Sequence, residues 1–239
     1  MSFLRPWTYR ITANLRVLIR NDTLVLAVLA MLVGAVVGGA VVAFRELIVG
    51  SQFVFFGSAT EFLAKHAADL DWWRRLLAPA AGGLIVGLVI YWLIPQRRPL
   101  GIADVVEVVA LRAGRMPFRD GVVAALVSAM SIGAGASVGR EGPAVHLGAT
   151  LASVVAAALH LTRTLTQTLL GCGVAAAVAA SFNAPIAGAL FATEVVLGHY
   201  ALSSFAPVVI ASVVATFVSR GWYGPYPALE VMDFPDISL

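Results

Sequence analysis

The chain has 239 residues, of which 60% are hydrophobic and 12% are charged, and its formal net charge is +3. Soluble domains carry about 25% charged and about 45–50% apolar residues, so this composition excludes an ordinary soluble domain and predicts an integral membrane protein. The positive charge does not indicate a nucleic-acid partner, because the arginines lie in short loops between apolar runs, where they act as orientation signals. The single cysteine, Cys172, excludes a disulfide framework and a thiolate metal cluster.

Residues 1–22 are predicted to form a cytoplasmic amphipathic segment. Four arginines are scattered along it, and no short apolar core is followed by a cleavage site, which argues against a cleavable signal peptide. We therefore expect a helix that lies on the membrane surface.

Residues 23–48 and 76–94 are the first two long apolar runs. Each is near or above the roughly 20 residues that cross about 30 Å of hydrocarbon, so both are predicted to span the membrane. The stretch 50–75 mixes aromatic residues with charges of both signs, which is typical of a connection at the water interface. Small residues in the apolar runs, among them Gly34, Gly38, Gly39 and Cys172, predict close helix packing.

Beyond Arg98 the apolar runs become shorter and are separated by glycine and proline. They comprise residues 102–113, 117–135, 143–160, 165–181, 185–198 and 205–219. Several are too short to cross a membrane alone, and broken helices at membrane depth are tolerated only where they face protein or a watery cavity. The pattern predicts an all-α, polytopic membrane protein of broken, tilted helices over residues 23–220, with a transport site among them.

The distribution of arginines predicts the orientation. The arginines of the amino-terminal segment and of residues 97–119 should face the cytoplasm. Residues 221–239, which contain Glu230, Asp233 and Asp236, then form an external tail or the start of a linker, and the number of crossings is odd. We expect a bacterial inner membrane as the location, with lipid around the spans.

Residues 139–143 place an Arg-Glu pair between glycines inside this apolar region. Charges at membrane depth are costly, so such a pair predicts a function. The glycines leave backbone N–H groups uncovered, and Pro143 suits the first turn of a following helix. A helix amino terminus of this kind binds anions, and the Glu141 carboxylate would compete for the same position.

A second motif, residues 180–191 with the sequence ASFNAPIAGALF, is followed by Glu194. Together the two motifs resemble the CLC family of chloride channels and chloride/proton exchangers, and the resemblance runs from about residue 24 to the end. It implies an all-helical fold of two inverted halves, and a homodimer with one anion pathway per subunit. The resemblance covers only the first of these halves, and nothing in residues 1–120 repeats the signatures of 121–239. A second half is therefore expected to be needed for a complete homodimer.

The resemblance implies roles for individual residues. Glu141 resembles the gating glutamate, and Gly139, Arg140 and Gly142 flank it in the anion site. Arg140 would either attract anions or pair with a carboxylate or a carbonyl, and both alternatives stay open. An earlier anion-coordinating turn aligns with residues 99–104, where Gly101 and Ile102 offer backbone N–H groups. Leu100 and Ala103 stand where the family usually has serine and proline, so the serine hydroxyl that would donate to an anion is missing. The alternative is that residues 97–104 form only a cytoplasmic turn and bind no anion.

The position that carries a glutamate in many exchangers aligns with Val195. The resemblance therefore favours a passive, voltage- or pH-gated chloride channel with Glu141 as its gate. A chloride/proton antiporter is one alternative, in which Glu194 would take the proton role instead of being a helix-end carboxylate in cytoplasmic water. A non-conducting fragment or subunit that needs the second half is another.

A serine hydrolase is a remote alternative, because residues 135–139 match the G-x-S-x-G pattern around Ser137. That pattern requires a preceding strand, whereas the flanks read as glycine-rich helix. His146, three residues after Pro143, would respond to pH near its ordinary pKa or simply pack. No cluster of metal ligands and no cofactor motif is present, so we expect neither a metal nor a cofactor.

Overall fold

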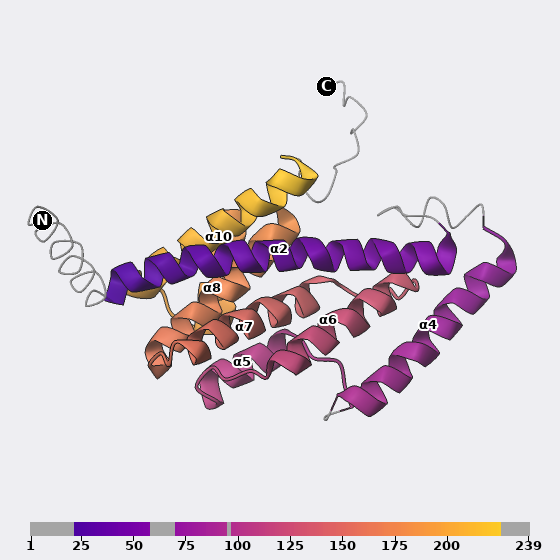
Figure 1. Ribbon diagram of the computed structural model, residues 1–239, viewed down its shortest axis with the longest axis horizontal. Coiled ribbons are helices and arrows are strands. Elements are labelled where there is room, and N and C mark those ends of the chain that lie inside the picture. The colour runs from indigo at the N-terminus through magenta and orange to yellow at the C-terminus, as the bar shows by residue number, and fades with distance from the viewer. Residues whose placement is uncertain (1–21, 58–69, 95–96, 226–239) are drawn as a thin grey trace, which may run out of the picture.

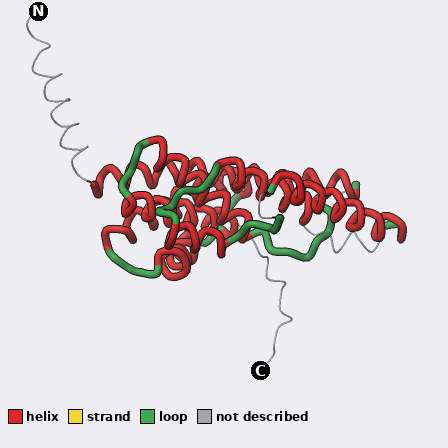
Figure 2. The backbone as a smooth tube through the Cα atoms, turned by 90° about the horizontal axis from the view of Figure 1, so that it is seen from below, coloured by secondary structure: helices red, strands yellow, loops and turns green. Residues whose placement is uncertain are grey.

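The computed structural model describes residues 22–57, 70–94 and 97–225, and all regular elements within these ranges are helical (Figures 1 and 2). The predicted segment 1–21 and the tail beyond residue 225 lie outside the described residues, as do Glu230, Asp233 and Asp236. In chain order the elements are α2 (Asp22–Phe56), α4 (Trp72–Leu93), α5 (Ile102–Leu111), α6 (Phe118–Gly133), α7 (Glu141–Ala158), α8 (Arg163–Phe182), α9 (Pro185–Phe191), the π-helix η1 (Ala192–Leu197) and α10 (Leu202–Tyr223).

Four of the described helices, α2, α4, α8 and α10, are long and apolar enough to cross a membrane. Both spans predicted near the amino terminus are therefore confirmed as candidates. The predicted end of the first span was wrong, because α2 continues to Phe56 instead of ending near Ile48. Residues 53–56 are all apolar, so the helix continues where we expected an interfacial connection. The orientation and the odd number of crossings stay predictions.

The shorter, broken helices also form where the apolar runs predicted them. The predicted run 185–198 is the exception, since α9 ends at Phe191 and a π-helical turn, η1, continues to Leu197. A π-helical turn contains more residues than an α-helical turn, so η1 changes which side chains face the rest of the protein. Gly198 ends it with a positive φ of 71°.

Helix α8 forms the centre of the molecule. Every residue from Thr168 to Ser181 is buried, and 83% of the most apolar window of the helix lies inside the structure. Helices α7, α10 and α2 pack against it. Cys172 has no exposed surface, so its predicted packing role is confirmed.

Glycines allow these helices to approach closely. A Cβ atom on Gly148 of α7 would lie 2.5 Å from the carbonyl oxygen of Gly173 in α8, and one on Gly34 of α2 would lie 2.6 Å from the carbonyl oxygen of Ala211 in α10. Gly38 has a similar contact with Ala215. Gly39 is exposed and has nothing within 4 Å of its Cβ position, so its predicted packing role was wrong.

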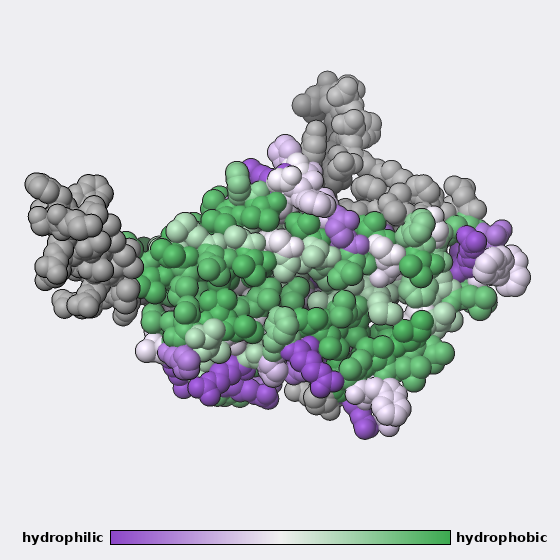
Figure 3. Space-filling view, in the orientation of Figure 1, coloured by the Kyte–Doolittle hydropathy of each residue, from purple (hydrophilic) through white to green (hydrophobic). Residues whose placement is uncertain are grey.

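The outer surface is apolar. In Figure 3 hydrophobic residues cover most of the visible face, and hydrophilic residues gather toward its edges. Helix α4 is mostly exposed, with only 11% of its apolar window buried. Its outward side chains include Leu84 and Trp92, which are 66% and 78% exposed. Such a surface suits contact with lipid or with further protein.

We expect Gly34→Val to lower the free energy of unfolding by about 1–3 kcal/mol, because the new side chain would overlap the backbone of α10. The matched control is Gly39→Val in the same helix, which adds the same side chain to open space and should cost less than about 0.5 kcal/mol. Reversible unfolding of the purified protein in SDS-containing mixed micelles measures both. Equal losses in the two variants would contradict the packing of α2 on α10.

Candidate functional site

The amino termini of α5 and α7 meet. A Cβ atom on Gly142 in the first turn of α7 would lie only 4.0 Å from the Cα atom of Gly101, the residue that precedes α5. Helix amino termini carry unsatisfied N–H groups and a partial positive charge. Two of them at one point form an environment that favours an anion.

The connection between α6 and α7 brings Glu141 to this point. Gly135 turns the chain at the end of α6 with a φ of 97°, which favours glycine. At the far end of α7, Ser153 Oγ accepts a hydrogen bond from the Met116 amide at 2.9 Å and donates one to the Gly114 carbonyl at 2.7 Å. These two hydrogen bonds attach the segment between α5 and α6 to α7. They therefore hold α5 in place relative to α7.

The Glu141 carboxylate lies over the amino terminus of its own helix. A Cβ atom on Gly139 would overlap Glu141 Oε2, so the side chain folds back against that glycine. Glu141 is half-buried. Its carboxylate accepts no hydrogen bond from the side chains or amides of the described residues. The carboxylate therefore lies against Gly139, beside the helix start where the sequence predicts an anion.

At the start of α5, one backbone N–H that was predicted to bind an anion is already hydrogen-bonded to Asp104. The Gly101 amide donates to Asp104 Oδ2 at 2.8 Å, and the Arg98 guanidinium donates to both carboxylate oxygens. Asp104 is the third residue of α5, so its side chain reaches back to the residue before the helix, as in a capping box. The Gly101 N–H is therefore already paired in this structure, and its role toward an anion stays a prediction. The first-turn N–H of Ile102 has no acceptor within the helix and keeps its predicted role.

Asp104 lies outside the four long apolar helices, and its carboxyl has a pKa below the ordinary value. Burial raises this pKa, but the hydrogen bonds from Arg98 and the Gly101 amide, together with the Arg98 charge, outweigh that effect. Sequence reasoning missed this role of Asp104. The signal was its spacing of three residues from Gly101.

A groove of about 200 Å³ runs beside the meeting point, between α4, α6 and the start of α7. Leu100, Gly139 and Pro143 line it together with Ser128 and Ser131 of α6. Leu100 brings no donor, as expected, but the two serine hydroxyls face the same groove. Sequence reasoning missed them; the signal was two serines three residues apart in the apolar part of α6, after Asp120.

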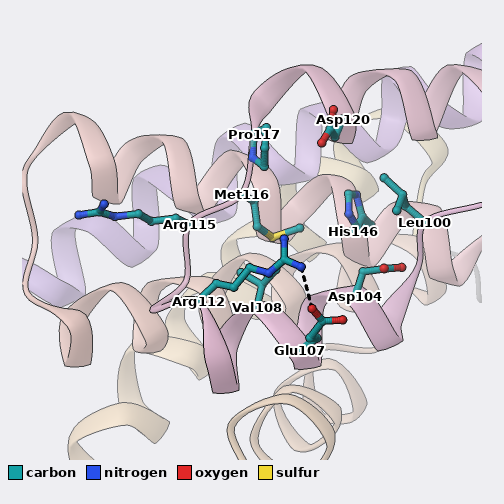
Figure 4. Close-up of a pocket in the computed structure, with 10 residues that line it drawn as sticks. All are labelled: Leu100, Asp104, Glu107, Val108, Arg112, Arg115, Met116, Pro117, Asp120 and His146. Carbon is teal, nitrogen blue, oxygen red and sulfur yellow. Dashed lines mark hydrogen bonds and ion pairs between the residues drawn. The ribbon is translucent and has the colours of Figure 1, made fainter. Parts of the chain in front are cut away.

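Leu100 also lines a second, smaller pocket of about 50 Å³, which lies between α5, α6 and α7. Figure 4 shows the His146 ring there, between the carboxylates of Asp104 and Asp120. His146 is only 3% exposed, and its Nδ1 atom has no hydrogen-bond partner among the described residues. The remaining lining residues are Glu107, Val108, Arg112, Arg115, Met116 and Pro117.

The second sequence motif forms the junction of α8 and α9. Asn183 ends α8 with a φ of 57°, and Pro185 begins α9. Asn183 Oδ1 accepts a hydrogen bond from Arg220 Nε at 2.6 Å. Glu194 and Val195 follow on η1, and both are exposed. Glu194 accepts a hydrogen bond from the Tyr200 hydroxyl at 3.4 Å and lines neither the groove nor the small pocket.

Ser137 lies in the loop between α6 and α7 and is exposed. No strand precedes it within residues 97–136, so the strand-to-helix turn of a hydrolase nucleophile is not formed there. The geometry does not support the hydrolase alternative.

Comparisons with known proteins identify the family of this chain. A family profile described as voltage gated chloride channel matches residues 82–239. A putative chloride channel protein ClcB-like from Ralstonia nicotianae is 35% identical over 208 residues, which cover 85% of this chain and 48% of that protein. The voltage-gated ClC-type chloride channel ClcB of Yersinia pseudotuberculosis is 34% identical over 195 residues, which cover 81% of this chain and 47% of that protein.

Solved structures give the same result for the fold. A CLC-type fluoride/proton antiporter superposes with a TM-score of 0.67 at 26% identity, over 90% of this chain and 50% of that chain. A cyanobacterial Cl⁻/H⁺ antiporter gives a TM-score of 0.69 at 23% identity, over 92% of this chain and 51% of that chain. The chain therefore spans about half the length of the relatives that it matches.

Asp104→Asn should loosen the start of α5, because the Gly101 amide loses a charged acceptor worth about 1.5–3 kcal/mol. We expect hydrogen–deuterium exchange in residues 99–106 to become roughly tenfold faster or more, as measured by mass spectrometry. Glu107→Gln is the control, because its pair with Arg112 is exposed and worth about 0–1 kcal/mol.

The pH dependence of the same exchange gives a second readout. Since the pKa of Asp104 is lowered, its contribution is present above the ordinary carboxyl pKa of about 4 and is lost only as the pH falls through the lowered value. A carboxyl titration step in this protection at the ordinary pKa of about 4, instead of below it, would contradict the clamp by Arg98 and Gly101.

Proposed function

Because this chain belongs to the voltage gated chloride channel family, we propose that it forms one wall of a transmembrane pathway for chloride or a similar small anion, with Glu141 as the gate. The observation that carries this proposal is the position of the Glu141 carboxylate. It lies against Gly139 at the point where the amino termini of α5 and α7 meet. A carboxylate and a free anion cannot both occupy that space.

The gate works by competition. While Glu141 is ionised it occupies the anion position and blocks the path. Protonation removes its charge and its attraction to the helix amino termini, so the side chain leaves and an anion enters. The Ile102 amide, the first-turn amides of α7 near Arg140 and Gly142, and the hydroxyls of Ser128 and Ser131 are the proposed donors along the path.

Passive conduction is the mode we propose, because the η1 position that carries a glutamate in many exchangers is Val195 here. The protein would lie in a bacterial inner membrane with its amino terminus in the cytoplasm, and would work as a homodimer once a second half completes each pathway. Such a second half would supply the donors opposite α5 and α7. A chain that does not conduct by itself, but serves as this half of an assembly, is the alternative.

A chloride/proton antiporter is the second candidate, and the π-helical form of η1 favours it. The wider turn changes the direction of the side chains after Phe191, and π-helical turns occur frequently at functional sites. Glu194, at the third position of η1, is exposed and therefore able to exchange protons with water. It would then act in place of a carboxylate at Val195.

Glu141→Gln should remove the competing charge. We expect chloride to bind on the order of tenfold more tightly, equivalent to about 1.4 kcal/mol, and chloride flux into liposomes to lose its inhibition at neutral pH. Binding is measured by calorimetry and flux with a chloride electrode. Glu107→Gln is the control, because this carboxylate is exposed and lies in an ion pair with Arg112. Unchanged binding and flux in Glu141→Gln would refute the gate.

Proton movement during chloride flux separates the two transport modes. A passive channel should move chloride without protons, and Glu194→Gln should leave that flux unchanged. If protons instead move in a fixed ratio to chloride and Glu194→Gln abolishes the proton component, the antiporter is correct. A pH-sensitive dye inside the liposomes measures protons in parallel with the chloride electrode. Absence of chloride flux and chloride binding in every variant would support the non-conducting alternative.

A further inference from the structure

The small pocket between α5, α6 and α7 contains a buried group without a partner. The His146 side chain lines this pocket, and its Nδ1 atom is enclosed and has no hydrogen-bond partner in the described part of the chain. A buried polar atom without a partner is uncommon and costs about 1–3 kcal/mol. It therefore requires a functional explanation or a ligand.

Two effects act against each other at His146: burial of the ring opposes its protonation, and two nearby carboxylates favour it. Asp104 of α5 and Asp120 of α6 are the carboxylates whose charges act on the imidazole, and Figure 4 shows the ring between them. The pocket volume of about 50 Å³ exceeds the roughly 10–15 Å³ that one water needs, so water can deliver a proton to the ring. Two carboxylates stabilise an imidazolium, which no apolar partner could do.

The other charged groups near the ring lie at the rim of the same pocket. They are Glu107 of α5 and the arginines Arg112 and Arg115 of the following segment, and Glu107 is paired with Arg112. Helix α8 carries no charged residue after Arg163, and the charged residues Arg45 and Glu46 of α2 contact Tyr223 of α10. Asp104 and Asp120 are thus the opposing charges that an imidazolium at His146 meets.

Asp104 connects this pocket to the anion site. Its carboxylate lines the pocket and also accepts the Gly101 amide, which lies beside Gly142. We propose that His146 is a proton-binding site and that its protonated ring competes for Asp104, which releases the Gly101 amide to an anion. The competition adds a positive charge to α7 and frees a donor on α5, so both effects strengthen anion binding. The anion part of this inference rests on the proposed function.

The effect on anion binding is measured in a Glu141→Gln background, which removes the titration of the gate. Chloride affinity is determined by calorimetry on the purified chain at about pH 5 and about pH 8, so that the lower pH lies well below the ordinary histidine pKa near 6.5. We expect chloride to bind on the order of tenfold more tightly at the lower pH, within the range of about 5- to 150-fold that is typical of coupled sites. Adding His146→Gln should reduce this ratio to about one while preserving the affinity at the higher pH.

His160→Gln is the matched control, because His160 lies in the turn between α7 and α8, is exposed, and does not line the pocket. It should retain the full pH effect. A ratio that survives His146→Gln, or that His160→Gln abolishes, would overturn the role of His146.

A second measurement does not depend on chloride. Hydrogen–deuterium exchange of the peptide that contains Gly101, corrected for the intrinsic rate, should lose protection as the pH falls through the histidine range, and His146→Gln should abolish this change. Equal behaviour of the two proteins would refute the proton site even if chloride binds. If protection is lost in a way that depends on His146 but no variant binds chloride, the proposed function is refuted. The proton-binding site at His146 is then still supported.

Discussion

The close contact of α7 with α8 is the constraint on which the rest of the structure depends. Helix α8 is the buried centre, and Gly148 and Gly173 let the two backbones approach to a distance that a Cβ atom would not permit. This contact sets how far Glu141 projects from the core. Since Gly101 before α5 lies beside Gly142 of α7, a displacement of α7 from α8 would change how the two helix amino termini meet. The electrostatics of the site therefore follow from a packing requirement in the centre of the molecule.

The two helix amino termini carry two carboxylates that behave differently. Asp104 is held by the Gly101 amide and by Arg98, and its lowered pKa follows from these partners together. Glu141 rests against a glycine and has no such hydrogen bonds. A locked carboxylate satisfies the end of α5, whereas a loosely held one can leave the end of α7. This contrast is the physical basis for proposing Glu141 as the gate.

Much of the fold could be predicted from the sequence, because apolar runs and glycine or proline breaks directly limit helices in a membrane protein. The starts of α5, α9 and the region around Glu141 agree with the expected positions. The errors have local causes. Helix α2 runs on to Phe56 because apolar residues continue past the expected interface, and η1 departs from the α-helical period, which hydrophobicity alone does not reveal. Gly39 was expected to pack, but small size does not say which face of a helix meets a neighbour.

The sequence by itself determined the membrane class, the helical fold, the family resemblance and the position of Glu141 at a helix amino terminus, because each of these depends on composition or on residues that are adjacent in the chain. Only the tertiary structure decided that Ser128 and Ser131 face the groove beside Leu100, and that His146 lies buried between two carboxylates. These features join residues from α5, α6 and α7. Their distances depend on how the helices pack, and no spacing along the chain specifies that packing.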